Sequence, residues 1–341
     1  MTPHKSIRTS DVGPDGPNHE SLAGCERGLK PEDVPYHFFA SNRWTPLVVS
    51  VPHAGLAWPD SLGASPQVSL QRNADFAVDS LFGIAPSLGA PVLAARFSRL
   101  VVDLNRASDD VSPELVPDHP NPRPVAIHHC IPSAQGLSTS ERALPPRRSM
   151  IAQNRGVLWA TAVGNIPVLK RLSYAQFRLR IERFYDPYYR ALETLLDRRI
   201  KRFGYAILLD AHSMPSIVGV DVVLGVRNYT SCAIELADEV CNILRVSCSD
   251  QERPWSLSID EPYPGGNIVK TFGRPNRGVH ALQIELNRGL YMDEVRLRLN
   301  HELKDDVRLH AHPSPTMVSN RIQTLITALC EPRDNLAPKR K

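Results

Sequence analysis

The chain has 341 residues, of which 42% are hydrophobic and 22% charged, and its formal net charge is only +4. This composition is that of a soluble globular protein, and the small charge excess, partly from the basic end Lys339–Lys341, argues against a nucleic-acid-binding protein. No apolar run approaches the 18 residues of a transmembrane helix, which argues against a membrane-spanning protein.

The domain is expected to cover residues 36–331 as a single unit. Residues 1–35 are rich in Pro, Gly, Asp and Ser and have no apolar period, which predicts a disordered arm. Residues 332–341 are expected to form a basic tail. Residues 107–155 hold many prolines and no periodic pattern, and a connection of this length inside a domain is usually functional or disordered. We favour a surface excursion that folds over the site.

Uninterrupted apolar runs bounded by Gly or Pro predict buried strands. They occupy residues 46–51, 91–97, 99–104, 205–212, 221–226, 255–259 and 279–286. In open α/β sheets the functional groups lie just beyond the carboxyl ends of such strands. The residues that follow these runs are therefore the first candidates for a site.

Apolar residues that recur every three or four positions predict helices between the strands. These are expected at 69–88, 173–201, 230–245, 293–309 and 316–330, with a hairpin at 156–172 that turns at Gly164 and Asn165. Strands that alternate with helices favour an α/β fold, a three-layer sandwich around one mixed sheet.

Two of these helices carry residues of special interest. The helix at 173–201 has the clearest period, with Ser173 as its cap and Pro187 as a predicted kink. In the helix at 69–88, Asp75 and Asp79 are four residues apart and would therefore share one face.

Four of the predicted strands end in, or carry, residues suited to metal chemistry: His53, Asn105 with Arg106, His212 and Glu285. Two histidines and a carboxylate are suitable zinc ligands when a fourth position stays open for water. A separate carboxylate can take the proton of that water and pass it to a leaving amine. An arginine at the same edge can hold an anionic group of the substrate.

Short motifs between about residues 45 and 295 occur in the order typical of one enzyme family. They are Ser50–Gly55, Asp75 with Val78–Asp79, Ser98–Arg106, Leu209–Pro215, Pro262–Gly266, and Gly278–Arg288 with Tyr291–Met292. With these motifs the sequence resembles the N-formylglutamate amidohydrolase (N-formylglutamate deformylase) family. The resemblance implies a zinc-dependent enzyme with a fold similar to the zinc carboxypeptidases.

The resemblance also implies a role for individual residues. His53 and His212 are the implied histidine ligands of Zn²⁺ or another divalent metal. Glu285 is the implied general base and acid, and Arg99 could polarise the scissile carbonyl. Arg106, beside Asn105, is the implied anchor for the substrate carboxylate.

The carboxylate ligand is left open by the sequence. Carboxypeptidases place a Glu three residues after the first histidine, but this position is Leu56 here. Asp75 and Asp79 are therefore both candidates for the third metal ligand.

The sequence departs from the family pattern at positions that bear on the substrate. Tyr189 stands where the family usually has His, Ala160 stands where it has Arg, and Asn267 replaces an aromatic that often follows the Gly-Gly pair. The implied metal ligands and the base are unaffected by these changes.

The function implied by the resemblance is hydrolysis of N-formylglutamate, or a similar N-acyl amino acid, to glutamate and formate, within histidine degradation. One alternative is a carboxypeptidase-like or other N-acyl amino acid hydrolase, suggested by Ala160 and Tyr189. Another is a diverged, inactive member that binds a metal or an amino acid. In each case a small anionic molecule is the expected partner, whereas nucleic acid and membrane are not.

The same residues also have purely structural explanations. A histidine after a strand is most often structural, and Asp75 and Asp79 would suit a solvated helix face equally well. Glu285 could be a core carboxylate paired with Arg288. Burial of a charge within an apolar strand is costly without a partner or a role, which favours a functional Glu285.

The six cysteines are scattered, with no C-x-x-C spacing, and the N-terminus shows no charged-then-apolar signal pattern. These features predict reduced thiols and a cytoplasmic location.

Overall fold

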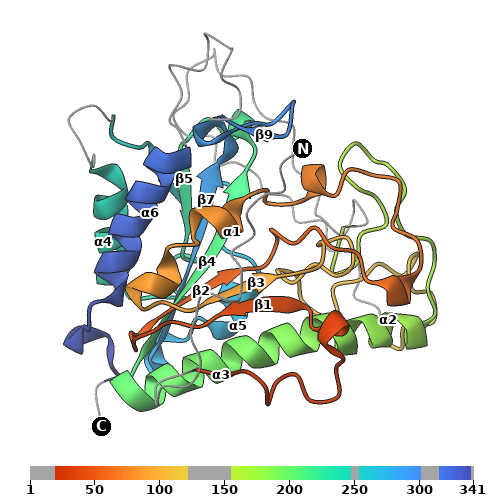
Figure 1. Cartoon of the computed structure of the whole chain (residues 1–341), viewed down its shortest axis with the longest axis horizontal. Helices are drawn as coiled ribbons and strands as arrows, with labels where there is room; N and C mark the ends of the chain where they lie inside the picture. Colours follow the sequence, from red (N-terminus) through yellow and green to blue (C-terminus); the bar gives the residue numbers. More distant parts are fainter. Residues whose placement is uncertain (1–19, 122–154, 247–252, 301–314, 339–341) are drawn as a thin grey trace.

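A mixed sheet of seven strands runs through the middle of the protein, with helices on both of its faces (Figure 1). The computed structural model describes residues 20–121, 155–246, 253–300 and 315–338. Across the sheet the strands are β1 (Tyr36–Phe39), β3 (Val92–Ala95), β2 (Leu47–Val51), β4 (Ala206–Met214), β7 (Val279–Asn287), β5 (Val222–Gly225) and β6 (Leu257–Ile259). The prediction of an α/β fold around a mixed sheet is confirmed.

The four strands β3, β2, β4 and β7 run parallel, so their carboxyl ends meet at one edge of the sheet. β1 pairs antiparallel with β3, and β5 pairs antiparallel with β7. The longest pairing joins β4 to β7, from Ala206 opposite Val279 to Met214 opposite Asn287. This pairing carries the two longest strands up to the edge at which functional residues were predicted.

The two faces of the sheet are covered by different helices. Because side chains alternate along a strand, Val49 and Leu209 face one side, where they pack with α1 (Val78–Leu81), α4 (Ile234–Arg245) and α6 (Pro315–Cys330). Figure 1 shows α4 and α6 side by side.

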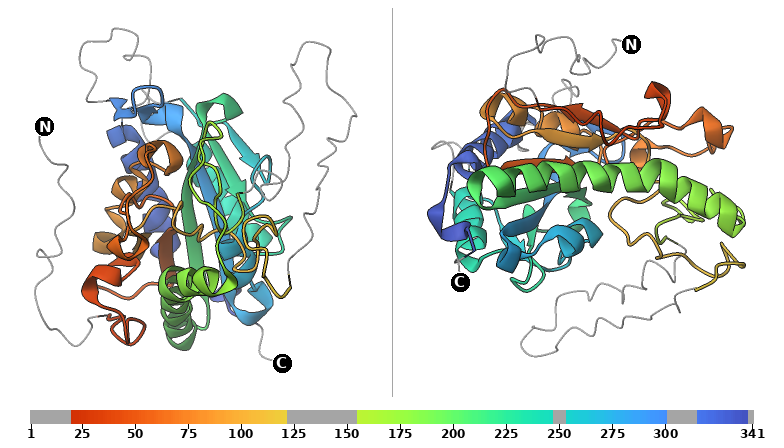
Figure 2. Two further views of the ribbon diagram at one scale, coloured as in Figure 1. Left: turned by 90° about the vertical axis from the view of Figure 1, so that its right-hand side faces the viewer. Right: turned by 90° about the horizontal axis from the view of Figure 1, so that it is seen from below.

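The opposite face packs against the longest helix and a short one. Val48 and Leu208 lie in a core with residues of α3 (Asp186–Phe203) and α5 (Asn267–Phe272). In the view from below in Figure 2, α3 passes across the sheet as part of one long helix. The sheet is thus the middle layer of three.

The long helix consists of α2 (Tyr174–Arg180), a π-helical segment (Ile181–Tyr185) and α3. The predicted cap is confirmed, since the Ser173 hydroxyl accepts a hydrogen bond from the Gln176 amide and the Gln176 side chain accepts one from the Ser173 amide. The π segment ends two residues before Pro187, which lacks the amide hydrogen that a regular turn would use.

The prediction of one helix over residues 69–88 is wrong. This segment forms two 3-10 turns, Gln71–Asn73 and Ala85–Leu88, on either side of the single turn α1. Ala77, just before α1, has a left-handed backbone with φ of 62°, which a continuous right-handed helix does not allow. Asp75 therefore precedes α1 instead of sharing a helical face with Asp79.

The strand predicted at 99–104 is also wrong. Residues 98–106 form successive turns, in which the Val101 amide donates to the Ser98 carbonyl and the Arg106 amide to the Asp103 carbonyl. The apolar residues that suggested a strand are buried by packing and not by sheet pairing.

Other predictions hold in part. At 156–172, Gly164 and Asn165 form the predicted turn with φ of 84° and 59°, but its two sides form no regular strands and pair through a single isolated bridge, Thr161 opposite Pro167. The helix predicted at 293–309 is wrong in its described part, because Met292–Asp293 (β8) and Arg298–Leu299 (β9) pair as a small hairpin.

Both ends of the described chain contact the domain. Glu20, within the predicted arm, is buried and binds Arg199 through Oε1–Nη1 and Oε2–Nη2 distances of 2.7 and 2.9 Å. In the predicted tail, the Leu336 carbonyl lies 2.9 Å from His280 Nε2. Residues 1–19, 339–341 and 122–154, which make up most of the Pro-rich excursion predicted over 107–155, lie outside the described residues. No described helix is both long and apolar enough to cross a membrane.

Candidate active site

The face of the sheet that packs on α3 and α5 changes from apolar to polar toward the carboxyl ends of β2, β4 and β7. On β4, for example, Leu208 is followed on the same face by Asp210 and His212. The polar side chains on this face are all buried, and their burial is costly unless they bind each other or a ligand. The polar residues on this face are Ser50, Asp210, His212, Gln283 and Glu285.

His53, Asp75 and His212 come together at this edge of the sheet. One ligand atom from each residue lies within 4.8 Å of the other two, and all three residues are buried. Asp75 Oδ2 is 3.0 Å from His212 Nδ1 and 3.5 Å from His53 Nδ1. Among the described residues, this is the one group of three or more His, Cys, Asp or Glu that could hold a metal ion.

Each histidine is held from behind by a carboxylate. His53 Nε2 lies 2.8 Å from Asp103 Oδ1, and His212 Nε2 lies 2.9 Å from Asp210 Oδ2. A carboxylate at this position fixes the ring and favours the tautomer with hydrogen on Nε2, so that the lone pair of Nδ1 points toward Asp75. This pairing of histidine with carboxylate is typical of metal sites.

The donor atoms fit a divalent cation. His53 Nδ1 is buried and has no hydrogen-bond partner among the described residues, a costly state for a polar atom. Two imidazole nitrogens and one carboxylate oxygen form a donor set that zinc commonly uses in catalytic sites. A cation between them would satisfy the unpaired nitrogen of His53.

The charges around these residues favour a positive centre. Burial opposes ionisation of Asp75, but the neighbouring rings of His212 and His53, 3.0 and 3.5 Å from Oδ2, outweigh it and hold the pKa of this carboxyl well below its usual value. Burial likewise lowers the pKa of His212, but Asp210, Asp75 and Glu285 together raise it well above its usual value. The surroundings of the cluster are therefore acidic.

Glu285 lies opposite His212 across β4 and β7 and is only 7% exposed. Burial and the charge of Asp75 raise its pKa from 4.5 to about 7, although His212 and Arg99 partly offset this. The Gln283 amide donates to Glu285 Oε1 at 2.8 Å and so orients the carboxyl group. A buried carboxyl with this pKa is suited to both accept and donate a proton near neutral pH.

The structure places Arg99 behind His53. Its guanidinium donates to Asp103 Oδ2 through Nη2 at 2.7 Å and through Nε at 3.2 Å, and it stacks on Trp159 at 4.6 Å from the ring centroid. The Trp159 indole also donates to Asp103 Oδ2, at 3.1 Å. Arg99 thus neutralises the carboxylate that holds His53.

Asn105 and Arg106, the predicted substrate-binding pair, differ in how they are bound. The Asn105 amide donates to Gln283 Oε1 at 3.0 Å and lies 3.2 Å from His212 Nε2. Arg106 makes no ion pair among the described residues, and its Nε is buried without a hydrogen-bond partner. The guanidinium of Arg106 is therefore available to an anionic ligand, whereas the Asn105 side chain is used within the protein.

Only one of the two candidate carboxylates lies in the cluster. Asp79 is exposed on α1, so the structure brings Asp75 and not Asp79 to the two histidines. Arg288, considered from the sequence as a partner of Glu285, instead lies 3.2 Å from Asp75 Oδ1 and 3.7 Å from Glu294 Oε1. Glu285 is left without this proposed structural partner.

Asp103 has no role at the site in the predictions from the sequence, and Arg288, predicted at Glu285, contacts Asp75 instead. Asp103 follows Arg99 by four residues, a spacing that brings the two together in this turn as it would in a helix.

Two positions at which the sequence departs from the family pattern, Asn267 and Tyr189, contact each other. The Asn267 side-chain amide donates to the Tyr189 hydroxyl at 2.8 Å.

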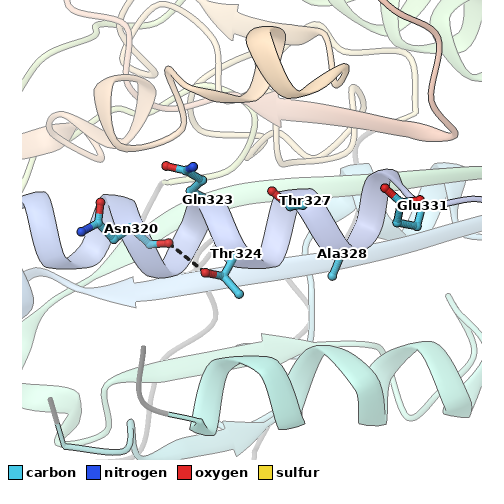
Figure 3. Close-up of a pocket in the computed structure, with 6 residues that line it drawn as sticks. All are labelled: Asn320, Gln323, Thr324, Thr327, Ala328 and Glu331. Carbon is cyan, nitrogen blue, oxygen red and sulfur yellow. Dashed lines mark hydrogen bonds between the residues drawn. The ribbon is translucent and has the colours of Figure 1, made fainter. Parts of the chain in front are cut away.

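A separate concave surface lies on the outward side of α6 (Figure 3). It is lined by Asn320, Gln323, Thr324, Thr327, Ala328 and Glu331. A single carboxylate and a few hydroxyl and amide groups along one helix provide neither a metal site nor a paired acid and base. The buried cluster remains the candidate active site.

Comparisons with known proteins agree with this geometry. The family model of N-formylglutamate amidohydrolase matches residues 45–292. An N-formylglutamate deformylase of Pseudomonas putida is 28% identical over 293 residues, which cover 82% of this chain and 92% of that protein. An N-formylglutamate deformylase of Pseudomonas aeruginosa is 30% identical over 261 residues, which cover 73% and 83%.

Solved structures resemble the fold as well. The crystal structure of N-formylglutamate amidohydrolase from Ralstonia eutropha JMP134 superposes with a TM-score of 0.69 and 26% identity, covering 87% of this chain and 97% of that one. The gene product Atu2144 of Agrobacterium tumefaciens gives a TM-score of 0.57 at 14% identity, which supports the fold alone.

Proposed function

Because the chain belongs to the N-formylglutamate amidohydrolase family, we propose that it hydrolyses N-formylglutamate to glutamate and formate at the cluster of His53, Asp75 and His212. One observation carries this proposal: the cluster lies beside Glu285, a buried carboxyl with a pKa of about 7, in direct register with His212. Metal-assisted hydrolysis of an amide requires this combination of ligands and a proton-transfer group.

His53, Asp75 and His212 would hold a divalent cation, and their nitrogen and oxygen donors favour zinc. When bound, such an ion supplies a Lewis acid that polarises the formyl carbonyl and makes water more acidic. Asp103 and Asp210 keep the two imidazoles oriented for this task. We also propose that the fold is similar to that of the zinc carboxypeptidases. The support for this is that His53 and His212 lie at the carboxyl ends of parallel strands.

Glu285 moves the proton. As a carboxylate it takes one proton from the attacking water, whose oxygen forms a bond to the formyl carbon. The protonated Glu285 then gives this proton to the amide nitrogen as the carbon–nitrogen bond breaks, which yields the free amine of glutamate and formic acid, and the acid releases its proton to become formate. Gln283, which donates to Oε1, holds the carboxyl group in place throughout.

Two arginines serve the substrate in this proposal. Arg106 binds a carboxylate of N-formylglutamate, because its guanidinium has no ion-pair partner among the described residues. Arg99 polarises the scissile carbonyl through Nη1, since its Nε and Nη2 are already bound to Asp103.

The reaction belongs to histidine degradation in the cytoplasm, a location that agrees with the free thiols of Cys25, Cys232, Cys241 and Cys330.

The test combines metal content with product release. Protein purified without chelators is analysed for metals, and formate release is measured from N-formylglutamate and from other N-formyl amino acids. Acetate release from N-acetylglutamate and amine release from short peptides are measured alongside. We expect about one divalent ion per chain and the highest kcat/KM with N-formylglutamate.

Two other outcomes would reject the proposal. A higher kcat/KM on another N-acyl amino acid or on peptides would assign a different hydrolase, for which Ala160 and Tyr189 provide the motive. Absence of bound metal, together with no activity after metal addition, would assign a non-catalytic protein.

A further inference from the structure

The segment Leu104–Arg106 is held at three consecutive carbonyl groups. The Leu104 carbonyl accepts a hydrogen bond from the Tyr189 hydroxyl at 2.8 Å, and the Arg106 carbonyl accepts one from the Tyr185 hydroxyl at 2.9 Å. The carbonyl between them, that of Asn105, accepts from the main-chain amide of Asn267 at 3.1 Å. A segment of turns has no strand neighbour to bind its carbonyls, so these three hydrogen bonds fix its path.

Asn267 connects all three contacts. Its side-chain amide donates to the Tyr185 hydroxyl at 3.0 Å and to the Tyr189 hydroxyl at 2.8 Å, while its main-chain amide binds Asn105. Each hydroxyl accepts from Asn267 and therefore has its own hydrogen free to donate to a carbonyl. The hydrogen bonds thus run in one direction, from amide to hydroxyl to carbonyl.

The two tyrosines are held as a pair. Their rings stack with centroids 4.2 Å apart and an interplanar angle of 13°. Burial raises the pKa of both hydroxyls well above the usual value, so both remain protonated donors across the range in which the protein would work. Tyr185 ends the π-helical segment, and Tyr189 lies four residues later on the same helical face.

The same helix also contacts the chain just before this segment, at Val101. Arg180, directly before the π-helical segment, donates from Nη1 to the Val101 carbonyl at 3.2 Å. The helix therefore supports both ends of the turns that carry Asp103, Asn105 and Arg106. π-Helical segments often occur at functional sites. Here the π-helical segment ends at Tyr185 and lies directly before the helical turn that carries Tyr189.

We propose that Asn267, with Tyr185 and Tyr189, is a positioning device that fixes the placement of Arg106 and thereby sets the affinity for the anionic substrate. The proposal rests on the proposed function, because it takes Arg106 as the substrate anchor. None of the three residues hydrogen-bonds to His53, Asp75, His212 or Glu285 within the described ranges. We therefore expect their loss to act mainly on Arg106 and on binding, and less on metal retention and proton transfer, which depend on the side chains of Asp103 and Gln283.

Two conservative variants test this device. Asn267→Asp keeps the shape but only accepts hydrogen bonds, so the hydroxyls turn toward the carboxylate and leave the carbonyls of Leu104 and Arg106. Tyr189→Phe keeps the stacked ring and removes one donor. For each variant we expect KM for N-formylglutamate to rise about tenfold, with kcat changed less than about twofold. Metal content should stay at the wild-type level.

Tyr174→Phe is the matched control. It removes a hydroxyl from the same helix, and that hydroxyl makes no contact with Leu104–Arg106 in the described structure. We expect wild-type KM for this variant. A KM rise as large as that of Tyr189→Phe would show a general effect of the helix and overturn the proposal.

A double-mutant cycle decides whether the device acts through Arg106. Asn267→Asp is combined with Arg106→Ala, and binding of glutamate, the product, is measured by calorimetry in all four proteins. We expect Asn267→Asp to weaken binding about tenfold in the wild-type background and to have little effect once Arg106 is absent. An equal loss in both backgrounds, or no loss in either, overturns the proposal.

Glutamate binding also separates the two proposals. It needs no turnover, so a protein that binds glutamate but releases no formate would reject the deformylase activity, while the cycle would still decide the positioning role. Failure of the wild-type protein to bind glutamate would overturn the positioning role, whereas formate release from N-formylglutamate would still decide the deformylase activity.

Discussion

His212 and Glu285 lie directly opposite each other on the parallel strands β4 and β7. One is the implied metal ligand and the other the implied base, so the sheet itself sets their spacing. A slip of one residue in this pairing would turn either side chain to the opposite face of the sheet. Such a slip is disfavoured, because it would also turn a neighbour such as Leu209 or Leu282 away from the apolar core on the opposite face, where both are fully buried.

Glu285→Gln should abolish most activity without loss of metal. Glutamine keeps the shape of the side chain but cannot take a proton from water, so kcat should fall about 10²- to 10⁴-fold. Formate release and metal analysis of the same preparation check both parts. Glu235→Gln, at an exposed carboxylate on α4, is the control and should retain wild-type kcat. Normal turnover by Glu285→Gln would show that another group is the base.

The pH profile should report the same carboxyl group. Burial raises the pKa of Glu285 to about 7, so the group is protonated, and inactive as a base, below this value. We therefore expect kcat/KM to rise with pH along an acidic limb at or below about pH 7, as a bound cation would favour the carboxylate. The residual activity of Glu285→Gln should lack this limb. Persistence of the limb in that variant would assign it to a different residue.

The choice between Asp75 and Asp79 can be settled by metal content. Asp75→Asn should lose the metal or bind it much more weakly, because an amide replaces the charged oxygen that faces His53 and His212. Asp79→Asn changes an exposed carboxylate on α1 and should retain one ion per chain. Both proteins are compared by elemental analysis after equal dialysis. Metal loss from Asp79→Asn alone would exchange the two assignments.

The strands that build the site were predictable because each is a long apolar run, and His53, His212 and Glu285 could be placed at their ends. Asp75 could not be placed, because the left-handed backbone at Ala77 leaves no trace in the apolar period. Asp103 was hidden for another reason. Its neighbours Val101, Val102 and Leu104 have the apolar character of a strand, although they pack in turns whose partners lie far along the chain.

Arg288 should prove to be a positioning residue for Asp75, the proposed metal ligand. Its Nη2 donates to Asp75 Oδ1 at 3.2 Å and to the Ala74 carbonyl at 3.0 Å, and its Nε donates to the Ser213 hydroxyl at 3.0 Å. These hydrogen bonds occupy one oxygen of Asp75 and leave Oδ2 to face the two histidines. The contact therefore selects which oxygen of Asp75 is available to a metal.

Arg288→Lys tests this arrangement while it keeps the positive charge. A single ammonium group cannot reach Ser213, Ala74 and Asp75 at once, so Asp75 loses its fixed orientation. We expect metal affinity to fall about tenfold, measured by competition with a chromophoric chelator, and saturating metal to restore most of kcat. Arg296→Lys, at the exposed pair with Asp293, is the matched control and should bind metal as the wild type does. Unchanged metal affinity in Arg288→Lys would show that Asp75 is oriented without this arginine.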